Sequence, residues 1–485
     1  MSRSPPVRAV TLLAVAGAAA ASHAQVLLHP LVVVGDPVPG IGNVTSITDI
    51  AVNSAGSWAV AVATDHPNGN ANTLILRDGQ VAMREDDPAP GTGTTISFIG
   101  TSSLGPAGEL GVRIGLRNAQ SGQDSAIVRQ GQLVVRAGAP CTDPNVPAGT
   151  LYYSFFRSAM NESAQFFAPC ALRWGGGQLV RAAARITLDP QTGSTAQQLI
   201  VRPGDTLPGL GQVTDVLNGV WQGDINNSGH AVFTALSGNF AGIFMWTPGA
   251  TTALAIPNGA SPLPGRQWLN LTSAAVALGD GGDTAVAGSI SGEIATNAII
   301  ARNGAVYRQK GQPLPGLAQY SLTGFGVNRG PRLTADGRVL WFADWNGPAA
   351  ANAGVFLQDR MLAQEGDAVQ TPLGVLAIKS FALGDFGAVL VITPDGRYVV
   401  TRVVLTDGTT DGAAAILIDT AAPVCYANCD GSTAPPVLNV GDFGCYLQKF
   451  AAGLWYANCD GSTTPPVLNV GDFGCFLQRF AAGCP

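Results

Sequence analysis

Short alternating apolar segments recur between residue 25 and about residue 420, and each follows a polar or glycine-containing tight turn. Apolar side chains at every second position are typical of strands that bury one face. Seven such turn-plus-strand segments occur, at residues 53–62, 105–114, 161–168, 227–234, 279–287, 335–343 and 384–392. Further strand-like runs lie at residues 73–77, 125–129, 242–246, 298–302 and 354–358. The pattern predicts an all-β domain built from a repeated unit of several short strands.

A second turn, of the general form G-D-x-x-P-G, accompanies each copy of this repeat. It begins at residues 35, 85, 138, 204, 259, 311 and 366, so the start-to-start spacings are 50, 53, 66, 55, 52 and 55 residues. A repeat of this length with three or four strands suits one blade of a β-propeller. The sequence therefore predicts a seven-bladed β-propeller over residues 25–420. Two packed β-sandwiches are the alternative, although they would not require a constant phase between turn and strand.

The two ends of this domain indicate how the ring would close. The strand Leu31–Val34 precedes the first turn and has no blade of its own, whereas the segment Leu383–Asp419 contains strands but no following turn. Pairing of these two segments would complete one blade and remove exposed strand edges. We therefore expect the N-terminal and C-terminal segments of the domain to share a blade.

The turn-plus-strand segment resembles the N-x-x-G-x-x-A-F tandem repeats of proteins secreted by bacteria. The resemblance is clearest at residues 227–233, which read NSGHAVF, and it is loose in most other copies. It implies a secreted bacterial repeat domain and does not assign a ligand.

An aspartate recurs at the second position of the G-D turn, as Asp36, Asp205 and Asp367. A carboxylate that serves several blades at one phase is expected to accept hydrogen bonds from turn amides rather than to act in catalysis. We interpret these residues as structural.

Composition agrees with short strands and many turns, and it narrows the choice of partner. Charged residues make up 12% of the chain, which contains 62 glycines and 32 prolines. The net charge is −6 and the acidic residues are mostly scattered, so no basic stripe is available to neutralise phosphates. Nucleic acid is therefore not expected as a partner.

The N-terminal 24 residues have the pattern of a signal peptide. Arg3 and Arg8 supply positive charge, residues 9–21 are apolar, and Ala24 ends a small-residue cleavage site before Gln25. A membrane anchor is the alternative, but the apolar run is shorter than the roughly 20 residues needed to span a bilayer. No later stretch qualifies as a transmembrane helix. We expect a secreted chain that is extracellular or held at the cell surface.

The eight cysteines are distributed unevenly and form an even set, as expected in an oxidising compartment. Only Cys141 and Cys170 precede residue 421, and both lie in the longest interval between turns. A disulfide between them, stapling a longer excursion of one blade, is the prediction; a free thiol is the alternative. The other cysteines crowd the last 61 residues, where a unit too small to bury a large core needs crosslinks.

These last residues consist of a tandem repeat. Residues 426–455 and 456–485 differ at five of thirty positions. Each copy begins with a loop rich in Gly, Pro and oxygen-bearing side chains. In the first copy, Phe443, Leu447 and Phe450 follow at helical spacing and Gly453 ends the segment. The sequence predicts two copies of a loop followed by a helix.

The tandem repeat resembles the dockerin duplicated calcium-loop module, in its cysteine-containing bacterial form, over residues 425–485. This resemblance implies EF-hand-like calcium loops and a cohesin-like or other surface protein as partner. Its ligand positions, carried onto this sequence, are Asn428, Asp430, Ser432, Asn439 and Asp442 in the first copy and Asn458, Asp460, Ser462, Asn469 and Asp472 in the second.

The loops depart from the family pattern in two ways. Asn replaces the usual opening Asp, and a Thr-Ala-Pro-Pro or Thr-Thr-Pro-Pro segment replaces the single turn glycine. With two carboxylates per loop, calcium affinity should lie toward the weaker extracellular range. A loop ordered by disulfides and Asx turns without metal is the alternative. A zinc site is disfavoured because no histidine lies near and the cysteines lack C-x-x-C spacing.

The module's cysteines suggest three crosslinks. Bonds within each copy, Cys429 with Cys445 and Cys459 with Cys475, are the simplest arrangement, and exchange between the copies is the alternative. Cys425 and Cys484 would then join the two ends of the module. Each short crosslink would stabilise it by roughly 3 kcal/mol on the loop-entropy model.

No catalytic residue is assigned from the sequence. It lacks the G-x-S-x-G, H-E-x-x-H and phosphate-loop signatures. Our leading hypothesis is a secreted, non-catalytic protein that binds or displays a ligand and attaches to a surface partner through its C-terminal module. The alternative is an extracellular carbohydrate-active enzyme, a polysaccharide hydrolase or lyase, since paired carboxylates suffice for glycoside chemistry.

Overall fold

The computed structural model describes residues 28–189, 191–217, 219, 222–326, 329–382, 387–421, 426–429, 436–451, 457, 459–460 and 468–483. The predicted signal peptide, residues 1–24, lies outside this part of the chain. So does the predicted pair Cys425 and Cys484. Within the described residues, none of the helices has the length and apolar character needed to cross a membrane.

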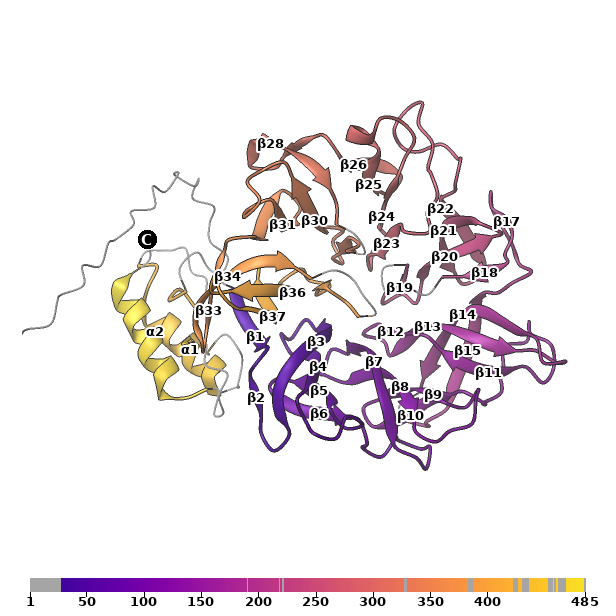
Figure 1. Ribbon diagram of the computed structural model, residues 1–485, viewed down its shortest axis with the longest axis horizontal. Coiled ribbons are helices and arrows are strands. Elements are labelled where there is room, and N and C mark those ends of the chain that lie inside the picture. Colours follow the sequence, from indigo (N-terminus) through magenta and orange to yellow (C-terminus); the bar gives the residue numbers. More distant parts are fainter. Residues whose placement is uncertain are drawn as a thin grey trace, which may run out of the picture.

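Seven small antiparallel sheets follow one another around a central axis, as Figure 1 shows. Blade I contains β2 (Pro37–Val38), β3 (Gly42–Val52), β4 (Trp58–Thr64), β5 (Thr73–Arg77) and β6 (Gln80–Arg84). Blade II contains β7 (Ile96–Leu104), β8 (Leu110–Leu116), β9 (Ser125–Arg129) and β10 (Gln132–Arg136). Blade III contains β11 (Leu151–Phe155), β12 (Ala159–Met160), β13 (Gln165–Arg173), β14 (Leu179–Leu188) and β15 (Thr195–Val201).

The remaining blades follow the same plan. Blade IV contains β18 (Asp215–Val216), β19 (Gly223–Ile225), β20 (Ala231–Ser237), β21 (Phe240–Thr247) and β22 (Ala250–Ala255), preceded by the hairpin of β16 (Thr206–Leu207) and β17 (Gly211–Gln212). Blade V contains β23 (Ala275–Leu278), β24 (Thr284–Ser289), β25 (Ala298–Arg302) and β26 (Ala305–Gln309), with a short 3-10 helix at Ile294–Thr296. Blade VI contains β27 (Pro313–Leu314), β28 (Leu317–Gly324), β29 (Arg332–Leu333), β30 (Val339–Trp345), β31 (Ala353–Leu357) and β32 (Arg360–Gln364).

Blade VII closes the ring with strands from both ends of the domain. It contains β33 (Ala368–Thr371), β34 (Gly374–Phe381), β35 (Leu390–Ile392), β36 (Tyr398–Thr406), β37 (Asp411–Asp419) and the N-terminal β1 (Leu28–Val33). Strand β1 pairs antiparallel with β37 from Leu28 opposite Ile418 to Val33 opposite Ala414. The prediction of a seven-bladed propeller closed by the two ends of the domain is confirmed.

The hydrophobic core is divided into clusters that lie between neighbouring blades. One cluster joins Ile75 of blade I to Val112 of blade II, and another joins Val400 of blade VII to Val62 of blade I. Five further clusters fill the other blade junctions. Each blade therefore buries both of its faces against its neighbours, which explains why the strands are apolar on both sides at their centres.

The recurring tight turn has the same backbone conformation in every blade. Its fourth residue has a positive φ, a conformation that glycine adopts without steric cost. The residues are Gly56, Gly108, Ala164, Gly229, Gly282, Gly337 and Gly396, with φ from 59° at Ala164 to 87° at Gly282. Three predicted positions need correction. The turns of blades IV and VI begin at Asn226 and Thr334 rather than at Asn227 and Ala335. The turn of blade VII begins at Thr393, whereas Leu390–Ile392 is the innermost strand β35.

The aspartates of the G-D turn have the expected structural role. In each case a carboxylate oxygen accepts a hydrogen bond from the amide three residues earlier, at 2.7 Å from Val33 to Asp36 and 2.9 Å from Arg202 to Asp205. Asp367 binds the amide of Gln364 in the same way, at 2.8 Å.

The predicted Cys141–Cys170 disulfide is wrong, because both thiols are free and buried. Cys170 lies in the middle of β13, and Cys141 follows β10 with its thiol 3.7 Å from the Tyr152 hydroxyl. Both cysteines pack in the cluster between blades II and III, where a thiol behaves as a small apolar side chain. Burial raises the pKa of both thiols above their usual value.

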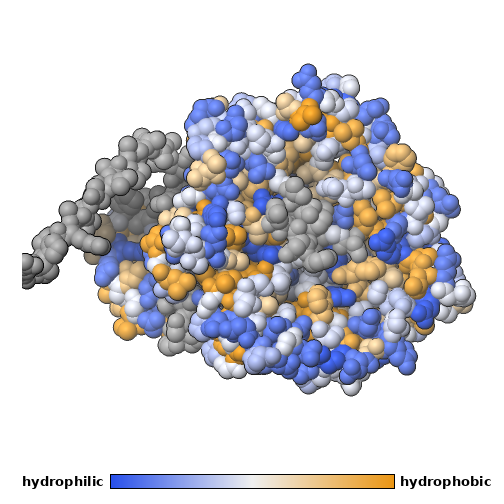
Figure 2. Space-filling view, in the orientation of Figure 1, coloured by the Kyte–Doolittle hydropathy of each residue, from blue (hydrophilic) through white to orange (hydrophobic). Residues whose placement is uncertain are grey.

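Two helices follow the ring, α1 (Val440–Ala451) and α2 (Val470–Ala482). Figure 1 shows them beside blade VII, near β33 and β1. Burial, together with the positive charge of Arg479 on α2, lowers the pKa of His29 on β1 to about 3. In Figure 2, hydrophilic residues line much of the outer rim of the ring.

Candidate functional site

A cavity of about 230 Å³ lies on the propeller axis, where the inner strands of the blades converge. Its lining comes from the C-terminal parts of β3, β7 and β23 and from β12, β19, β29 and β35, together with residues next to these strands. The inner edge of a propeller is the place where seven separate segments approach one another. Residues far apart in the sequence are thereby placed around one space.

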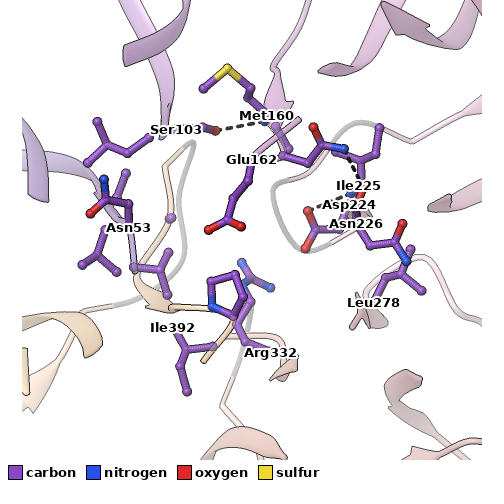
Figure 3. Close-up of a pocket in the computed structure, with 18 of the residues that line it drawn as sticks. Asn53, Ser103, Met160, Glu162, Asp224, Ile225, Asn226, Leu278, Arg332 and Ile392 are labelled. Carbon is purple, nitrogen blue, oxygen red and sulfur yellow. Dashed lines mark hydrogen bonds between the residues drawn. The ribbon is translucent and has the colours of Figure 1, made fainter. Parts of the chain in front are cut away.

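Charged side chains from different blades face this cavity. Figure 3 shows Glu162 and Asp224 with their carboxylates turned toward the same space as the side chain of Arg332. Glu162 follows β12 of blade III, Asp224 lies in β19 of blade IV, and Arg332 begins β29 of blade VI. All three side chains are half-buried.

Glu162 is held by hydrogen bonds from both of its sides. One carboxylate oxygen accepts the Ser54 hydroxyl at 3.2 Å, and the other accepts the Asn227 side-chain amide at 3.1 Å. The same Asn227 amide donates to Asp280 at 2.8 Å. Glu162 and Asp280 are therefore bridged by a neutral side chain, and within the described residues neither carboxylate forms an ion pair.

Asp224 and Arg332 have few hydrogen-bond partners among the described residues. Asp224 accepts one hydrogen bond, from the adjacent amide of Ile225 at 2.9 Å, and Arg332 donates one, to the adjacent carbonyl of Pro331 at 3.2 Å. Burial raises the pKa of Asp224, and the charges of Arg332 and Arg157 oppose that rise. Burial also lowers the pKa of Arg332, opposed by Asp224. The charges of Asp224 and Arg332 therefore interact electrostatically. In the described part of the chain, however, neither forms an ion pair within 4.0 Å.

Arg157 lines the cavity, but its guanidinium forms hydrogen bonds with the protein backbone. Its guanidinium donates to the carbonyl of Gly219 at 2.8 Å and to that of Gly223, which ties blade III to blade IV. Burial lowers the pKa of Arg157 to about 10. We therefore assign Arg157 to ring cohesion.

Asp49 also serves the ring rather than the cavity. Its carboxylate accepts the amide and hydroxyl of Ser102 in blade II, at 2.7 and 2.8 Å, and the amide of Ala388 in blade VII, at 2.7 Å. Asp49 as a whole is 3% exposed. Burial raises its pKa despite these bonds and the nearby charge of Arg402. Asp49 thus links blade I to both of its neighbours.

Asp224 and Arg332 were not among the predicted site residues, although the repeat contains a signal for them. Both lie two residues before the first residue of the recurring turn. At this position the seven blades carry Ala51, Ser103, Ala159, Asp224, Ala277, Arg332 and Val391. Five blades have a small or apolar residue there. A charged residue at this position in blades IV and VI is therefore not needed to form a blade.

The second candidate site is the C-terminal module. Disulfides join Cys429 to Cys445 and Cys459 to Cys475, which confirms the predicted bonds within each copy. The rings of Tyr446 and Phe476, at equivalent positions of α1 and α2, stack with their centroids 4.1 Å apart. Both rings are fully buried. The two copies therefore pack face to face through matching residues.

The structure describes six of the ten predicted calcium ligands. These are Asn428, Asn439, Asp442, Asp460, Asn469 and Asp472, whereas Asp430, Ser432, Asn458 and Ser462 lie outside the described residues. Asn469 caps α2 by accepting the amide of Gly471 at 2.7 Å, and Asn439 accepts the amide of Gly441 at 2.6 Å. Asp442 and Asp472 are fully buried in the first turns of their helices.

In the second loop the carboxylates of Asp460 and Asp472 converge. The amide of Asp460 donates to Asp472 at 3.2 Å, and that of Asn469 donates to it at 2.8 Å. Burial and the neighbouring Asp460 carboxylate raise the pKa of Asp472. Two carboxylates held together without a cation repel each other, so this donor set suits a hard cation such as calcium. Within the described residues, no three His, Cys, Asp or Glu side chains are grouped to hold a metal.

Comparison with known families assigns this chain. A family model described as "Family of unknown function (DUF7453)" matches residues 8–374. The protein belongs to this family. Within the DUF7453 region and the segment after it, the chain forms the seven-bladed propeller described above. No curated protein matches the sequence.

Solved structures that match this chain are distant in sequence. The β-propeller domain of the Trilobed protease from Pyrococcus furiosus is 11% identical over 75% of this chain and 96% of that chain, with a TM-score of 0.37. A gluconolactonase from Xanthomonas campestris is 12% identical over 68% and 91%, with a TM-score of 0.27. The sialidase of Trypanosoma rangeli is 9% identical over 80% and 58%, with a TM-score of 0.29. At these levels the similarities carry no argument about function.

Proposed function

We propose that this member of the DUF7453 family is a secreted, non-catalytic binding protein. Its propeller binds or displays a ligand, and its C-terminal dockerin-like module attaches it to a cohesin-like or other extracellular surface partner when calcium is bound. Asn428, Asp430, Ser432, Asn439 and Asp442 would hold one ion, and Asn458, Asp460, Ser462, Asn469 and Asp472 the other.

The observation that carries the proposal is the convergence of Asp460 and Asp472 at the start of α2. These residues occupy the third and twelfth positions of the predicted loop, the two positions at which it supplies carboxylates. A calcium ion would relieve the repulsion between them and would stabilise the folded module. The buried Asp442 at the equivalent place in the first copy supports a second site.

Matched exposed apolar residues support docking through the helices. Val440 and Val470, at the starts of α1 and α2, are 86% and 85% exposed, and Leu447 and Leu477 are 43% and 42% exposed. Exposed apolar side chains at equivalent positions of two helices are available to a protein partner. Calcium at the loops would fix the helix starts and so position these side chains.

Circular dichroism of the full chain tests the calcium step. The helical signal at 222 nm should melt at a higher temperature with calcium than with a chelator, because an ion that binds only the folded module stabilises it. Asp442→Ala and Asp472→Ala should each reduce this gain. Glu293→Ala, which removes an exposed carboxylate of the propeller, is the control. Equal melting with and without calcium would reject the calcium role and leave a module ordered by its disulfides.

The alternative function is a carbohydrate-active enzyme, favoured by the presence of Glu162 and Asp224 in one cavity. A glycosidase uses two carboxylates, one of which has a raised pKa and acts as the acid. The pKa of Asp224 is raised by burial. Hydrolysis of any member of a polysaccharide panel, abolished by Asp224→Asn or Glu162→Gln, would establish the enzyme and overturn the non-catalytic proposal. Absence of hydrolysis across the panel supports it.

A further inference from the structure

The charges around the axial cavity are separated in space. Glu162, Asp224 and Asp280 come from blades III, IV and V, whereas the guanidinium of Arg332 comes from blade VI. Arg157 of blade III keeps its positive charge, but its two terminal nitrogens bind backbone carbonyls. The lining therefore combines these three carboxylates with the guanidinium of Arg332, whose one hydrogen bond among the described residues goes to the adjacent Pro331 carbonyl.

Two of these side chains retain hydrogen-bonding capacity that faces the cavity. Asp224 uses one oxygen for the adjacent Ile225 amide, and no other described residue donates a hydrogen bond to this carboxylate. Arg332 uses one N–H for the Pro331 carbonyl, and a guanidinium has five N–H groups. Figure 3 shows both side chains turned into the same space. A half-buried carboxylate and a half-buried guanidinium that do not pair with each other gain most from partners of opposite charge.

The size and lining of the cavity limit what could fill it. Its volume of about 230 Å³ is below the range of roughly 300 to 1,000 Å³ that is usual for drug-sized ligands. None of the described residues that line it is aromatic. A site for a quaternary ammonium group would be expected to present aromatic faces. The lining therefore favours a small ligand held by charge-assisted hydrogen bonds.

Position within the repeat supports a ligand-binding role for these two residues. Blades with Ala, Ser or Val at the same position form the same turn and inner strand. Charge at Asp224 and Arg332 is thus unnecessary for building a blade, and burying it costs free energy unless it is compensated.

We propose that the axial cavity binds a small zwitterion with an ammonium group and a carboxylate, of the size of a free amino acid. Asp224 accepts the ammonium group, and Arg332 donates to the carboxylate, with two parallel N–H groups available for it. Glu162, fixed by Ser54 and Asn227, adds negative potential on the ammonium side. This inference rests on the proposed role of the propeller as a binding domain, and it names the ligand class.

The test is calorimetric titration of the full chain with the common L-amino acids, one at a time. For any amino acid that binds, its N-acetyl derivative lacks the ammonium charge and its methyl ester lacks the carboxylate. Each derivative should bind about 10- to 100-fold more weakly, since a hydrogen bond to a charged group contributes roughly 1.5 to 3 kcal/mol. Glucose and methylamine serve as neutral and purely cationic probes and should bind more weakly than the amino acid.

Variants assign the two ends of the ligand. Asp224→Asn should lower the affinity for the amino acid to that of its N-acetyl derivative for the unaltered chain. Arg332→Gln should lower it to that of the methyl ester. Asp124→Asn and Arg360→Gln, which change exposed residues outside the cavity, are the matched controls and should leave binding unchanged. The comparison of ligands on the unaltered chain needs no variant, so it decides the matter even if a variant fails to fold.

Three results would overturn the zwitterion proposal. These are no binding by any amino acid, equal binding of an amino acid and its two derivatives, and unchanged binding in both cavity variants. Preferred binding of glucose would also overturn it while leaving the propeller as a binding domain. Calcium-dependent melting of the helices is measured separately, so failure of the ligand class and failure of the attachment role can be told apart.

Discussion

The side chain of Asn226 joins the recurring turn of blade IV to that of blade V, and its removal gives a sharp test of how the ring is held together. Its side-chain N–H donates to the carbonyl of Gly279 at 3.0 Å, and its side-chain oxygen accepts the amide of His230 at 2.9 Å. Asn53 and Asn161 make the same inter-blade bond, to Gly105 and Asn226. The asparagine of the turn therefore has two functions, one within its blade and one toward the next.

The expected loss of stability follows from burial. Asn226 is 3% exposed. Asn226→Ala leaves a carbonyl and an amide without their partners, each at a cost of about 1 to 2 kcal/mol, so the free energy of unfolding should fall by about 2 to 4 kcal/mol. Asn226→Asp keeps the acceptor for the His230 amide but replaces the donor with a carboxylate, close to the Gly279 carbonyl.

Guanidinium denaturation followed by tryptophan fluorescence measures both variants. The introduced carboxyl should have a raised pKa in the folded chain, because its ionised form faces a carbonyl and its protonated form can donate to it. The deficit of Asn226→Asp relative to the unaltered chain should therefore be small below the unfolded carboxyl pKa and should grow as pH rises through the folded pKa. Losses below about 0.5 kcal/mol in both variants would refute the inter-blade role of the asparagine.

Three further predictions concern other buried groups. Asp49→Asn should lower the free energy of unfolding by about 2 to 4 kcal/mol in the same assay. The reason is that an amide has one acceptor oxygen and cannot replace all the hydrogen bonds of the carboxylate, among them those from Ser102. An unchanged midpoint would contradict this. Alkylation after unfolding without reductant should label Cys141 and Cys170, as mass spectrometry would show, whereas an unlabelled pair would mean that they form a disulfide. Without calcium, the melting temperature of the helices should fall as pH rises from below the ordinary carboxyl pKa through the raised pKa of Asp472. Calcium should remove that fall, and a melting temperature that instead rises with pH would show that the raised pKa is wrong.

The periodic part of the fold was readable from the sequence, and the exceptions have identifiable causes. Strands β5, β9 and β25 match the predicted runs because their apolar residues alternate between clear turns. The seventh turn was misplaced because the inner strand β35 is apolar, like the strand that follows the turn in the other blades. The phase error at Asn226 arose because Asn227 follows it and both residues are asparagine.

Local pattern could not predict the cysteines of the propeller or the axial site. Cys141 and Cys170 belong to an even set, and cysteine count alone does not distinguish a bonded pair from two thiols packed in a core. Asp224 and Arg332 are 108 residues apart and line one cavity only because the inner strands of the blades converge on the axis. In contrast, the bonds of the C-terminal module were predictable because each is contained in one short repeat.

Calcium stoichiometry tests the central claim most directly. Titration of the chelator-treated full chain with calcium by isothermal calorimetry should give two sites per chain, in the weaker extracellular range of affinity. Asp442→Ala or Asp472→Ala should each remove one site, and the double variant should show neither. Absence of binding heat at millimolar calcium, confirmed by equilibrium dialysis, would contradict the proposal that this module docks in a calcium-dependent manner.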